Sequence, residues 1–94
     1  KIKEHLDQRD EWQYFKIHFE NVNPNFFTKL KETFPSLSEN DLRFCAYIRI
    51  GMSTKEIAQI LSVLPDTVIT TRYRLRKKME LGQDSSLEDF LRTF

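Results

Sequence analysis

The sequence has little of what disulfide-stabilised, membrane-spanning or β-rich proteins depend on. Its single cysteine, Cys45, cannot form an internal disulfide, which fits a reducing compartment such as the cytoplasm. It has no apolar run of the roughly 20 residues that a membrane-spanning helix needs. With two glycines, three prolines and no alternation of apolar and polar residues, it lacks the pattern of β-strands. These absences leave one small helical domain of 94 residues.

The groups that catalysis or metal binding requires are also missing. His5 and His18 have no Cys, His or Asp partners at metal-ligand spacing, and the chain has no glycine-rich phosphate loop and no evident nucleophile–base pair. Cys45 lies in an apolar stretch, which favours an inert core thiol over a nucleophile. We therefore expect no enzyme activity, no cofactor, no metal and no small-molecule substrate.

The helix starts, by contrast, are clearly marked. Proline follows a capping residue at Asn23-Pro24, and an acidic residue follows a serine by three positions at Ser38 with Asp41, Ser53 with Glu56 and Ser85 with Glu88. Val22 and Phe27 have the spacing of a hydrophobic staple. We expect an all-α fold with helices at about 6–20, 24–33, 39–50, 54–62, 65–81 and 86–93.

Aromatic residues concentrate in the first two of these helices. Apolar residues at helical spacing usually face a core, although such a stripe could also bind a partner. We expect core packing for Trp12, Phe15, Phe19, Phe26, Phe27, Leu30 and Phe34, and also for Leu87, Phe90, Leu91 and Phe94. Residues 1–36 would then form an N-terminal helical extension packed on a domain at 37–94.

The helix expected at 65–81 has the strongest local charge excess in a chain of net charge +1. Residues 66–81 hold five basic and two acidic side chains. At about 100° per residue, Val68, Leu75 and Met79 face inward, and the opposite side presents Thr70, Tyr73 and Lys77, flanked by Ile69 and Arg74. Hydroxyl, aromatic and cationic groups are those that meet phosphates and base edges. The alternative is an ordinary basic surface.

The preceding segment supplies a context for this helix. A short helix with Ile57, Ala58 and Leu61 on one face precedes it, and Ala58 is small enough for a second helix to cross closely. The connection at 62–64 has the length that a helix-turn-helix uses. The pair therefore predicts a helix-turn-helix, with 65–81 as its second helix.

Together these elements resemble a known family. Leu37-Ser38, Gly51 through Ala58 with Leu61, Thr67-Val68 and Lys77-Lys78-Met79 stand at the spacing found in the DNA-binding domain of the LuxR/GerE family of bacterial transcription regulators. The family pattern is roughly L-T-x-x-E, G-x-x-x-x-E-I-A-x-x-L, T-V and K-K-L, and the match runs from Leu37 to Leu81 without gaps. The resemblance implies a four-helix LuxR/GerE-type helix-turn-helix domain, here with extra N-terminal helices and a short C-terminal helix.

The resemblance also implies binding to double-stranded DNA, with helix 65–81 in the major groove. Recognition helices contact bases through their N-terminal turns. The expected base contacts are Ile69, Thr70 and Tyr73. The expected phosphate contacts are Ser53, Thr54, Lys55, Thr67, Arg74, Lys77 and Lys78, and the expected structural residues are Glu56, Ala58, Val68, Arg72, Leu75 and Met79.

Several positions depart from the family pattern. Leu64 stands where a capping Ser or Thr is usual, so Pro65 and Asp66 must define the helix start. Asp41 replaces the usual Glu. Arg72 lies at the edge of the inward arc, where we expect its guanidinium to pair with an acid such as Asp41 or Glu56.

The partners remain open at this stage. In this family an upstream sensor or receiver module usually precedes the DNA-binding domain, and the absence of an initial Met leads us to expect a longer chain. DNA could be bound by a monomer or a homodimer. A protein-interaction module, with aromatic helices docking a partner and the basic helix binding an acidic protein, is the main alternative, and a sigma-factor promoter-reading domain is another.

Overall fold

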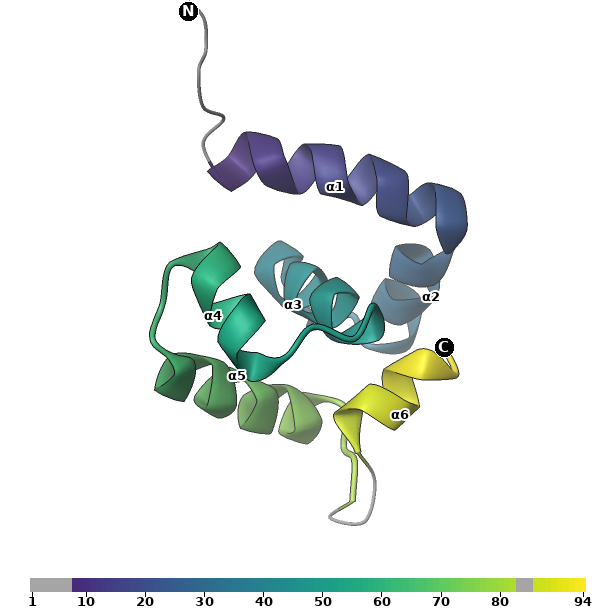
Figure 1. The fold of residues 1–94 in the computed structure, drawn as a ribbon. Coiled ribbons are helices and arrows are strands. Elements are labelled where there is room, and N and C mark those ends of the chain that lie inside the picture. The colour runs from purple at the N-terminus through teal and green to yellow at the C-terminus, as the bar shows by residue number, and fades with distance from the viewer. Residues whose placement is uncertain (1–7, 83–85) are drawn as a thin grey trace, which may run out of the picture.

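The computed structural model describes residues 8–82 and 86–94, and over these ranges the chain is helical without any strand (Figure 1). The helices are α1 (Gln8–Val22), α2 (Phe26–Thr33), α3 (Glu39–Arg49), α4 (Thr54–Leu61), α5 (Pro65–Lys78) and α6 (Leu87–Arg92). The expected all-α class is confirmed, and each of the six expected helices is found within a few residues of its expected bounds.

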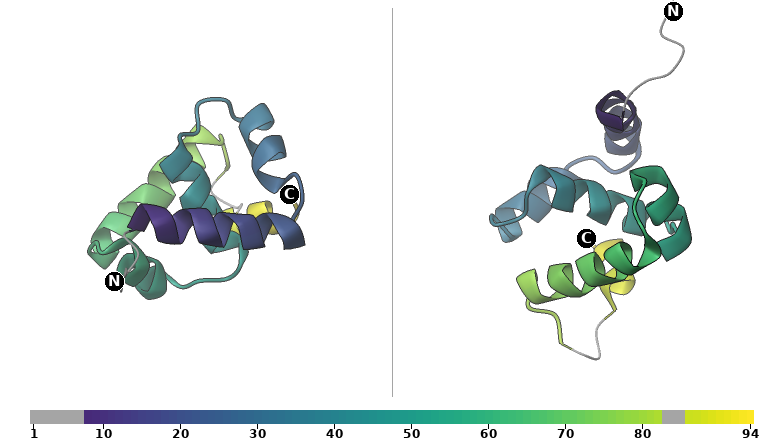
Figure 2. Two further views of the ribbon diagram at one scale, coloured as in Figure 1. Left: turned by 90° about the horizontal axis from the view of Figure 1, so that it is seen from above. Right: turned by 90° about the vertical axis from the view of Figure 1, so that its left-hand side faces the viewer.

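The helices are arranged around α3. α1 crosses one side of α3, and α5 runs along the opposite side, as Figures 1 and 2 both show. α2 and α6 also pack against α3, and α4 packs against α5. The outer side of α5 therefore lies at the far end of the molecule from α1.

The core is rich in aromatic side chains, as expected. Trp12, Phe19, Phe26 and Phe27 are buried, and Phe15, Phe34, Phe90 and Phe94 pack partly buried against them. Their rings meet mostly in edge or tilted contacts, the geometry that the ring quadrupoles favour. The aromatic stripe of the first two helices is thus core.

Cys45 lies at the centre of α3 and is completely buried. Burial, together with the nearby Asp41 charge, raises the pKa of this thiol to about 12. It therefore stays a neutral core side chain, as its apolar surroundings predicted.

Two of the predicted helix starts form complete capping boxes, at Ser38 with Asp41 and at Ser53 with Glu56. α6 is capped by Ser86, whose hydroxyl accepts the amide hydrogen of Asp89. The predicted capping residue Ser85 lies outside the described residues.

The predicted start of α2 is wrong. Asn23 does not cap this helix, and Pro24 is not its first residue; the cap is Asn25, in the left-handed region with φ 71°, and α2 begins at Phe26. The chain turns between α1 and α2, and asparagine is one of the few residues that tolerates the left-handed conformation. Val22 is 78% exposed, so the expected staple to Phe27 is also absent.

Candidate nucleic-acid interface

The turn between α4 and α5 is stabilised by its own backbone. Ser62 takes a left-handed conformation with φ 59°, and its amide donates to the Gln59 carbonyl oxygen at 3.2 Å. The Val63 amide donates to the Ala58 carbonyl oxygen at 2.9 Å. These two bonds satisfy carbonyls at the end of α4, as in a Schellman motif. The chain then enters α5 at Leu64, which makes no side-chain cap, with Pro65 in the first turn.

A small apolar interface holds α4 and α5 together. Ile57 and Ala58 of α4 are buried, and so are Val68 and Leu75 of α5. Met79, directly after α5, is buried as well. The predicted inward face of α5 is confirmed, and α4 and α5 form the predicted helix-turn-helix.

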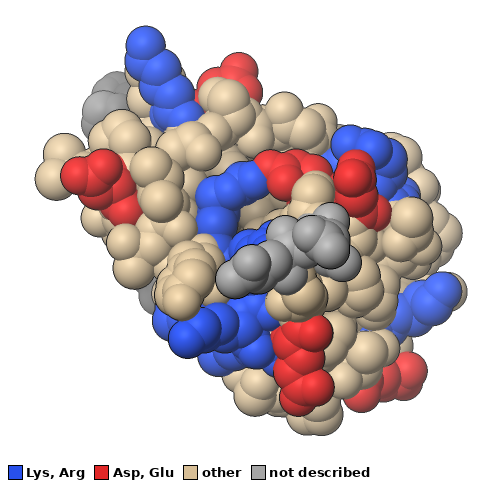
Figure 3. Space-filling view, turned by 90° about the horizontal axis from the view of Figure 1, so that it is seen from below, with Lys and Arg blue, Asp and Glu red and all other residues tan. Residues whose placement is uncertain are grey.

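The opposite side of α5 is open to solvent. Ile69 is 56% and Tyr73 59% exposed, and Thr70 and Lys77 are exposed beside them. The Lys77 ammonium lies 5.1 Å from the centre of the Tyr73 ring, a cation–π contact that keeps both side chains together on this face. Figure 3 shows the molecule from the side to which this face belongs, with basic and acidic side chains interspersed on uncharged surface.

Arg72 does not pair with either acid that the sequence suggested. Its guanidinium forms an ion pair with Glu88, in the first turn of α6. The pairing arises because α6 folds back onto α3 and brings its acidic N-terminal turn to the flank of α5. Burial lowers the pKa of the Arg72 side chain, which nevertheless stays charged.

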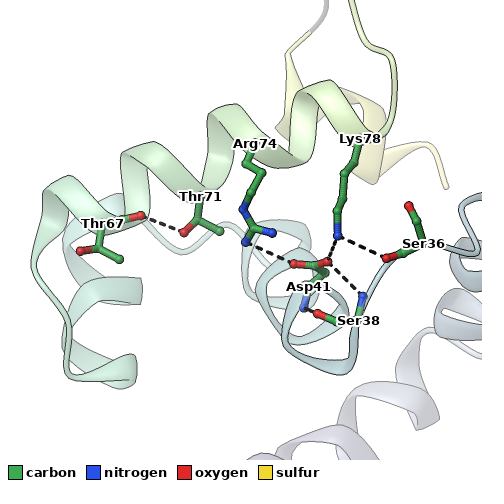
Figure 4. Close-up of polar contacts among 7 residues, drawn as sticks. All are labelled: Ser36, Ser38, Asp41, Thr67, Thr71, Arg74 and Lys78. Atoms are coloured by element: carbon green, nitrogen blue, oxygen red, sulfur yellow. Dashed lines mark hydrogen bonds and ion pairs between the residues drawn. The ribbon is translucent and has the colours of Figure 1, made fainter.

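Asp41 instead binds two other cations of α5 (Figure 4). Its carboxylate is 2% exposed; Oδ2 accepts from Lys78 Nζ at 2.7 Å and from the Ser38 amide at 3.0 Å, and Oδ1 lies 3.5 Å from Arg74 Nη2. The Lys78 ammonium also donates to the Ser36 carbonyl oxygen at 3.2 Å.

The protonation of Asp41 follows from these contacts. Burial by itself would raise the pKa of the Asp41 carboxyl, but the hydrogen bonds from Lys78 and Ser38 and the charges of Lys78 and Arg74 together hold this pKa below its ordinary value. The carboxylate is therefore ionised at neutral pH and ties α3 to α5.

Most of the positive charge of α5 is thus engaged inside the protein. Arg72, Arg74 and Lys78 face acids, and Arg76 donates to the Gly82 carbonyl oxygen at 2.8 Å. Lys77 has no acidic partner among the described residues and lies over Tyr73 instead. The local excess of basic residues in the sequence overstates the positive charge that this face offers to a ligand.

The start of α4 offers a second set of polar groups. Ser53 Oγ accepts from the Glu56 amide at 3.1 Å, and Glu56 Oε1 accepts from the Ser53 amide at 2.8 Å. The amides of Thr54 and Lys55 lie in the first helical turn, where a helix has no internal acceptor for them. Ser53 and Lys55 are exposed, and Thr54 is half-buried. This end of α4 can therefore donate hydrogen bonds to an anion.

A groove of about 190 Å³ lies between α3 and the helix-turn-helix. Thr67, Thr71 and Arg74 line it from α5, and the Thr71 hydroxyl donates to the Thr67 carbonyl oxygen at 2.8 Å. Arg43, which also lines this groove, was not among the predicted functional residues. Its Nε donates to the Tyr47 hydroxyl at 2.9 Å, and its guanidinium lies 5.7 Å from the Trp12 and Tyr47 rings, so it ties α1 to α3.

The described residues provide no group of three or more His, Cys, Asp or Glu side chains that could hold a metal ion. None of the helices described in the structure is long and apolar enough to cross a membrane. The exposed groups of this region include hydroxyls, amides, a few cations and the side chains of Ile69 and Tyr73.

Comparison with known proteins identifies this arrangement. Residues 35–90, from before α3 into α6, match the family GerE, described as bacterial regulatory proteins of the luxR family. Searches of curated proteins and of solved structures found no match. Because the family match covers more than half of the chain and its helix-turn-helix is formed in the structure, the protein belongs to the LuxR family, as a DNA-binding helix-turn-helix domain of a regulator.

Proposed function

We propose that this domain binds double-stranded DNA sequence-specifically, with the N-terminal half of α5 in the major groove. The observation that carries the proposal is the exposure of Ile69, Thr70 and Tyr73 on one side of a helix whose other side is anchored in the core. A major groove about 12 Å wide admits one α-helix, and a helix in this position presents its first turns to base edges.

The proposed base contacts favour A·T pairs. Ile69 can make only apolar contact, which suits the thymine methyl group, and Thr70 can donate or accept a hydrogen bond or pack its own methyl there. Tyr73 lies exposed one turn further along, with the Lys77 ammonium against its ring. The preference for particular base pairs thus rests mainly on Ile69 and Thr70.

The proposed phosphate contacts come from both helices. Lys77 pairs with no acid among the described residues, and Thr67 is exposed at the leading end of α5. Ser53, Thr54 and Lys55 add hydroxyl, amide and ammonium donors at the start of α4, where the helix dipole also favours an anion. The predicted contact from Lys78 is left out of this set, because Asp41 and the Ser36 carbonyl oxygen hold its ammonium, and the predicted contact from Arg74 requires Arg74 to leave Asp41 first.

The base contact of Thr70 is tested by replacing it with alanine. On a preferred duplex, selected from a random pool, Thr70→Ala should lose about 1–3 kcal/mol of binding free energy, with little loss on a scrambled duplex. Thr71→Ala is the matched control, because the Thr71 hydroxyl bonds to the Thr67 carbonyl and does not belong to the outer face. Equal losses on both duplexes would leave Thr70 as a positioning residue only.

The phosphate contact of Lys77 is tested by salt dependence. Lys77→Ala should weaken binding to all duplexes alike and lower the slope of log K against log salt by about 0.9, since one fewer counterion is released. An unchanged slope would remove Lys77 from the interface.

We further propose that the domain, which we place at 37–94 with 1–36 as its helical extension, acts in the cytoplasm as part of a longer regulator with an upstream sensor or receiver module. The sequence selected from a random duplex pool also reports the stoichiometry. Two half-sites in inverted repeat, spaced by one helical turn, would indicate a homodimer, and a single site a monomer.

A further inference from the structure

The two cations on Asp41 are held to different degrees. Lys78 has two acceptors, at 2.7 Å to Asp41 and 3.2 Å to the Ser36 carbonyl oxygen, and its side chain is 29% exposed. Arg74 has one contact, at 3.5 Å, and its side chain is 52% exposed. A nitrogen–oxygen distance of 3.5 Å lies beyond the usual range for a hydrogen bond. Arg74 is therefore the cation that can leave Asp41 at low cost.

Arg74 also stands beside the surface that is proposed to meet DNA. It follows Tyr73 directly on α5, at the flank of the outer face, and it lines the groove that Thr67 and Thr71 border. In Figure 4 its side chain extends from α5 toward Asp41 on the same side as Thr71. A guanidinium binds phosphate and carboxylate oxygens with the same planar set of donors, so either anion can bind it.

We propose that Asp41 competes with DNA for Arg74: it holds Arg74 in the free domain, and in the complex Arg74 turns to a backbone phosphate while Lys78 stays on Asp41. This inference rests on the proposed DNA-binding mode and adds to it an internal contact that lowers the affinity for DNA. Breaking the Asp41–Arg74 contact is a cost that every duplex has to overcome, whatever its sequence. Asp41 thus lowers affinity for all DNA and leaves the ratio between preferred and scrambled sites unchanged.

The test removes the charge of Asp41 and keeps the cap of α3. In Asp41→Asn the side-chain oxygen can still accept the Ser38 amide, as Asp41 does now. The variant should bind preferred and scrambled duplexes more tightly by the same factor, about twofold to fivefold for the loss of a long contact to a half-exposed arginine. Glu39→Gln is the matched control: it makes the same change in net charge on the same helix, but Glu39 contacts Trp12 and Lys16 of α1. It should give a smaller gain.

Double-mutant cycles identify the cation that carries the effect. The gain from Asp41→Asn should disappear in an Arg74→Ala background and persist in a Lys78→Ala background. A gain that persists without Arg74, or one that Glu39→Gln reproduces, would overturn the inference while the proposed function stands. If the unchanged domain binds no duplex at all, the proposed function falls, and this inference with it.

A second comparison applies if Asp41→Asn fails to fold. With Asp41 intact, Arg74→Ala should lower the salt slope by about 0.9, because Arg74 reaches a phosphate in the complex, and Lys78→Ala should leave the slope unchanged. Equal slopes for Arg74→Ala and the unchanged domain would overturn the inference. Far-ultraviolet circular dichroism of each variant establishes that the helices are intact before binding is measured.

Discussion

The starts of α3 and α4 are built by the same local motif. In each, a serine hydroxyl accepts from the amide three residues on, at 3.1 Å in both helices. The carboxylate of the acidic residue at that position accepts a bond from the serine amide, at 3.0 Å for Asp41 and 2.8 Å for Glu56. Judged by these bonds alone, the two capping boxes are equivalent.

The two capping boxes differ in the residues that contact their acidic side chains. Asp41 is 2% exposed and faces Arg74 and Lys78 of α5, whereas Glu56 is exposed and, among the residues that the structure describes, bonds only to Ser53. The same motif is a local helix start in α4 and a tertiary junction in α3. The difference shows that the packing partner, and not the motif, decides how much an acidic capping residue contributes.

The largest expected effect is that of Asp41→Ala. This change removes a cap and leaves two cations without their acid, and it should lower the free energy of unfolding by about 2–4 kcal/mol. Glu56→Ala is the matched control and should cost about 1 kcal/mol, because only a capping bond is lost. Urea denaturation followed by circular dichroism measures both. Equal losses would mean that the contacts with α5 add nothing to stability.

Lowering the pH should also reveal the contribution of Asp41 to stability, because it removes the charge of this side chain and leaves its shape unchanged. The pKa of Asp41 in the folded domain is lowered from the ordinary 3.8, so its stabilising contribution is complete above that value and is lost as the pH falls through the folded pKa. Between pH 5 and pH 2, the unfolding free energy of the unchanged domain should therefore fall more steeply than that of Asp41→Asn. Parallel curves would contradict the assignment. Glu39, whose pKa is also lowered, contributes in the same direction to both proteins.

Much of the fold was predictable because its signals are local. The capping serines Ser38 and Ser53 each bond within three residues, and the inward face of α5 follows from helical spacing alone. The start of α2 was mispredicted because a left-handed Asn25 depends on where α1 and α2 must pack, and the local Asn-Pro signal carries no information about that.

The polar contacts of the site were less predictable, because they depend on how helices cross. Asp41 was expected as a partner for Arg72, but α3 brings it to Arg74 and Lys78, and Arg72 pairs with Glu88 of α6. One signal was available: Arg74 and Lys78 are four residues apart, so a single acid can reach both. For Arg43 the spacing to Tyr47, four residues on in the same helix, was an available signal, but its contact with Trp12 depends on where α1 lies.

The serines should behave alike where the acids differ. Ser38→Ala and Ser53→Ala each remove one hydroxyl acceptor from an amide of the first turn, and each should lower the unfolding free energy by about 1 kcal/mol. The two losses should agree within about 0.5 kcal/mol, because neither hydroxyl has a second partner among the described residues. A much larger loss for Ser38 would show that the junction depends on the whole capping box and not on Asp41 alone.

The smallest effect should come from Glu56→Gln. Glutamine serves at this position of a capping box as well as glutamate, since its side-chain oxygen can accept the Ser53 amide in the same way. The charge that is lost is exposed to water and pairs with no cation among the described residues, so only its interaction with the helix dipole disappears. We expect a loss of a few tenths of a kcal/mol at low salt, decreasing as salt is added. Asp41→Asn, the same change in the other box, should cost distinctly more in the same urea titrations. It leaves Arg74 and Lys78 of α5 without their acid. If the two amide variants lose equal stability, Asp41 is only a cap, and the contrast between the two helix starts does not hold.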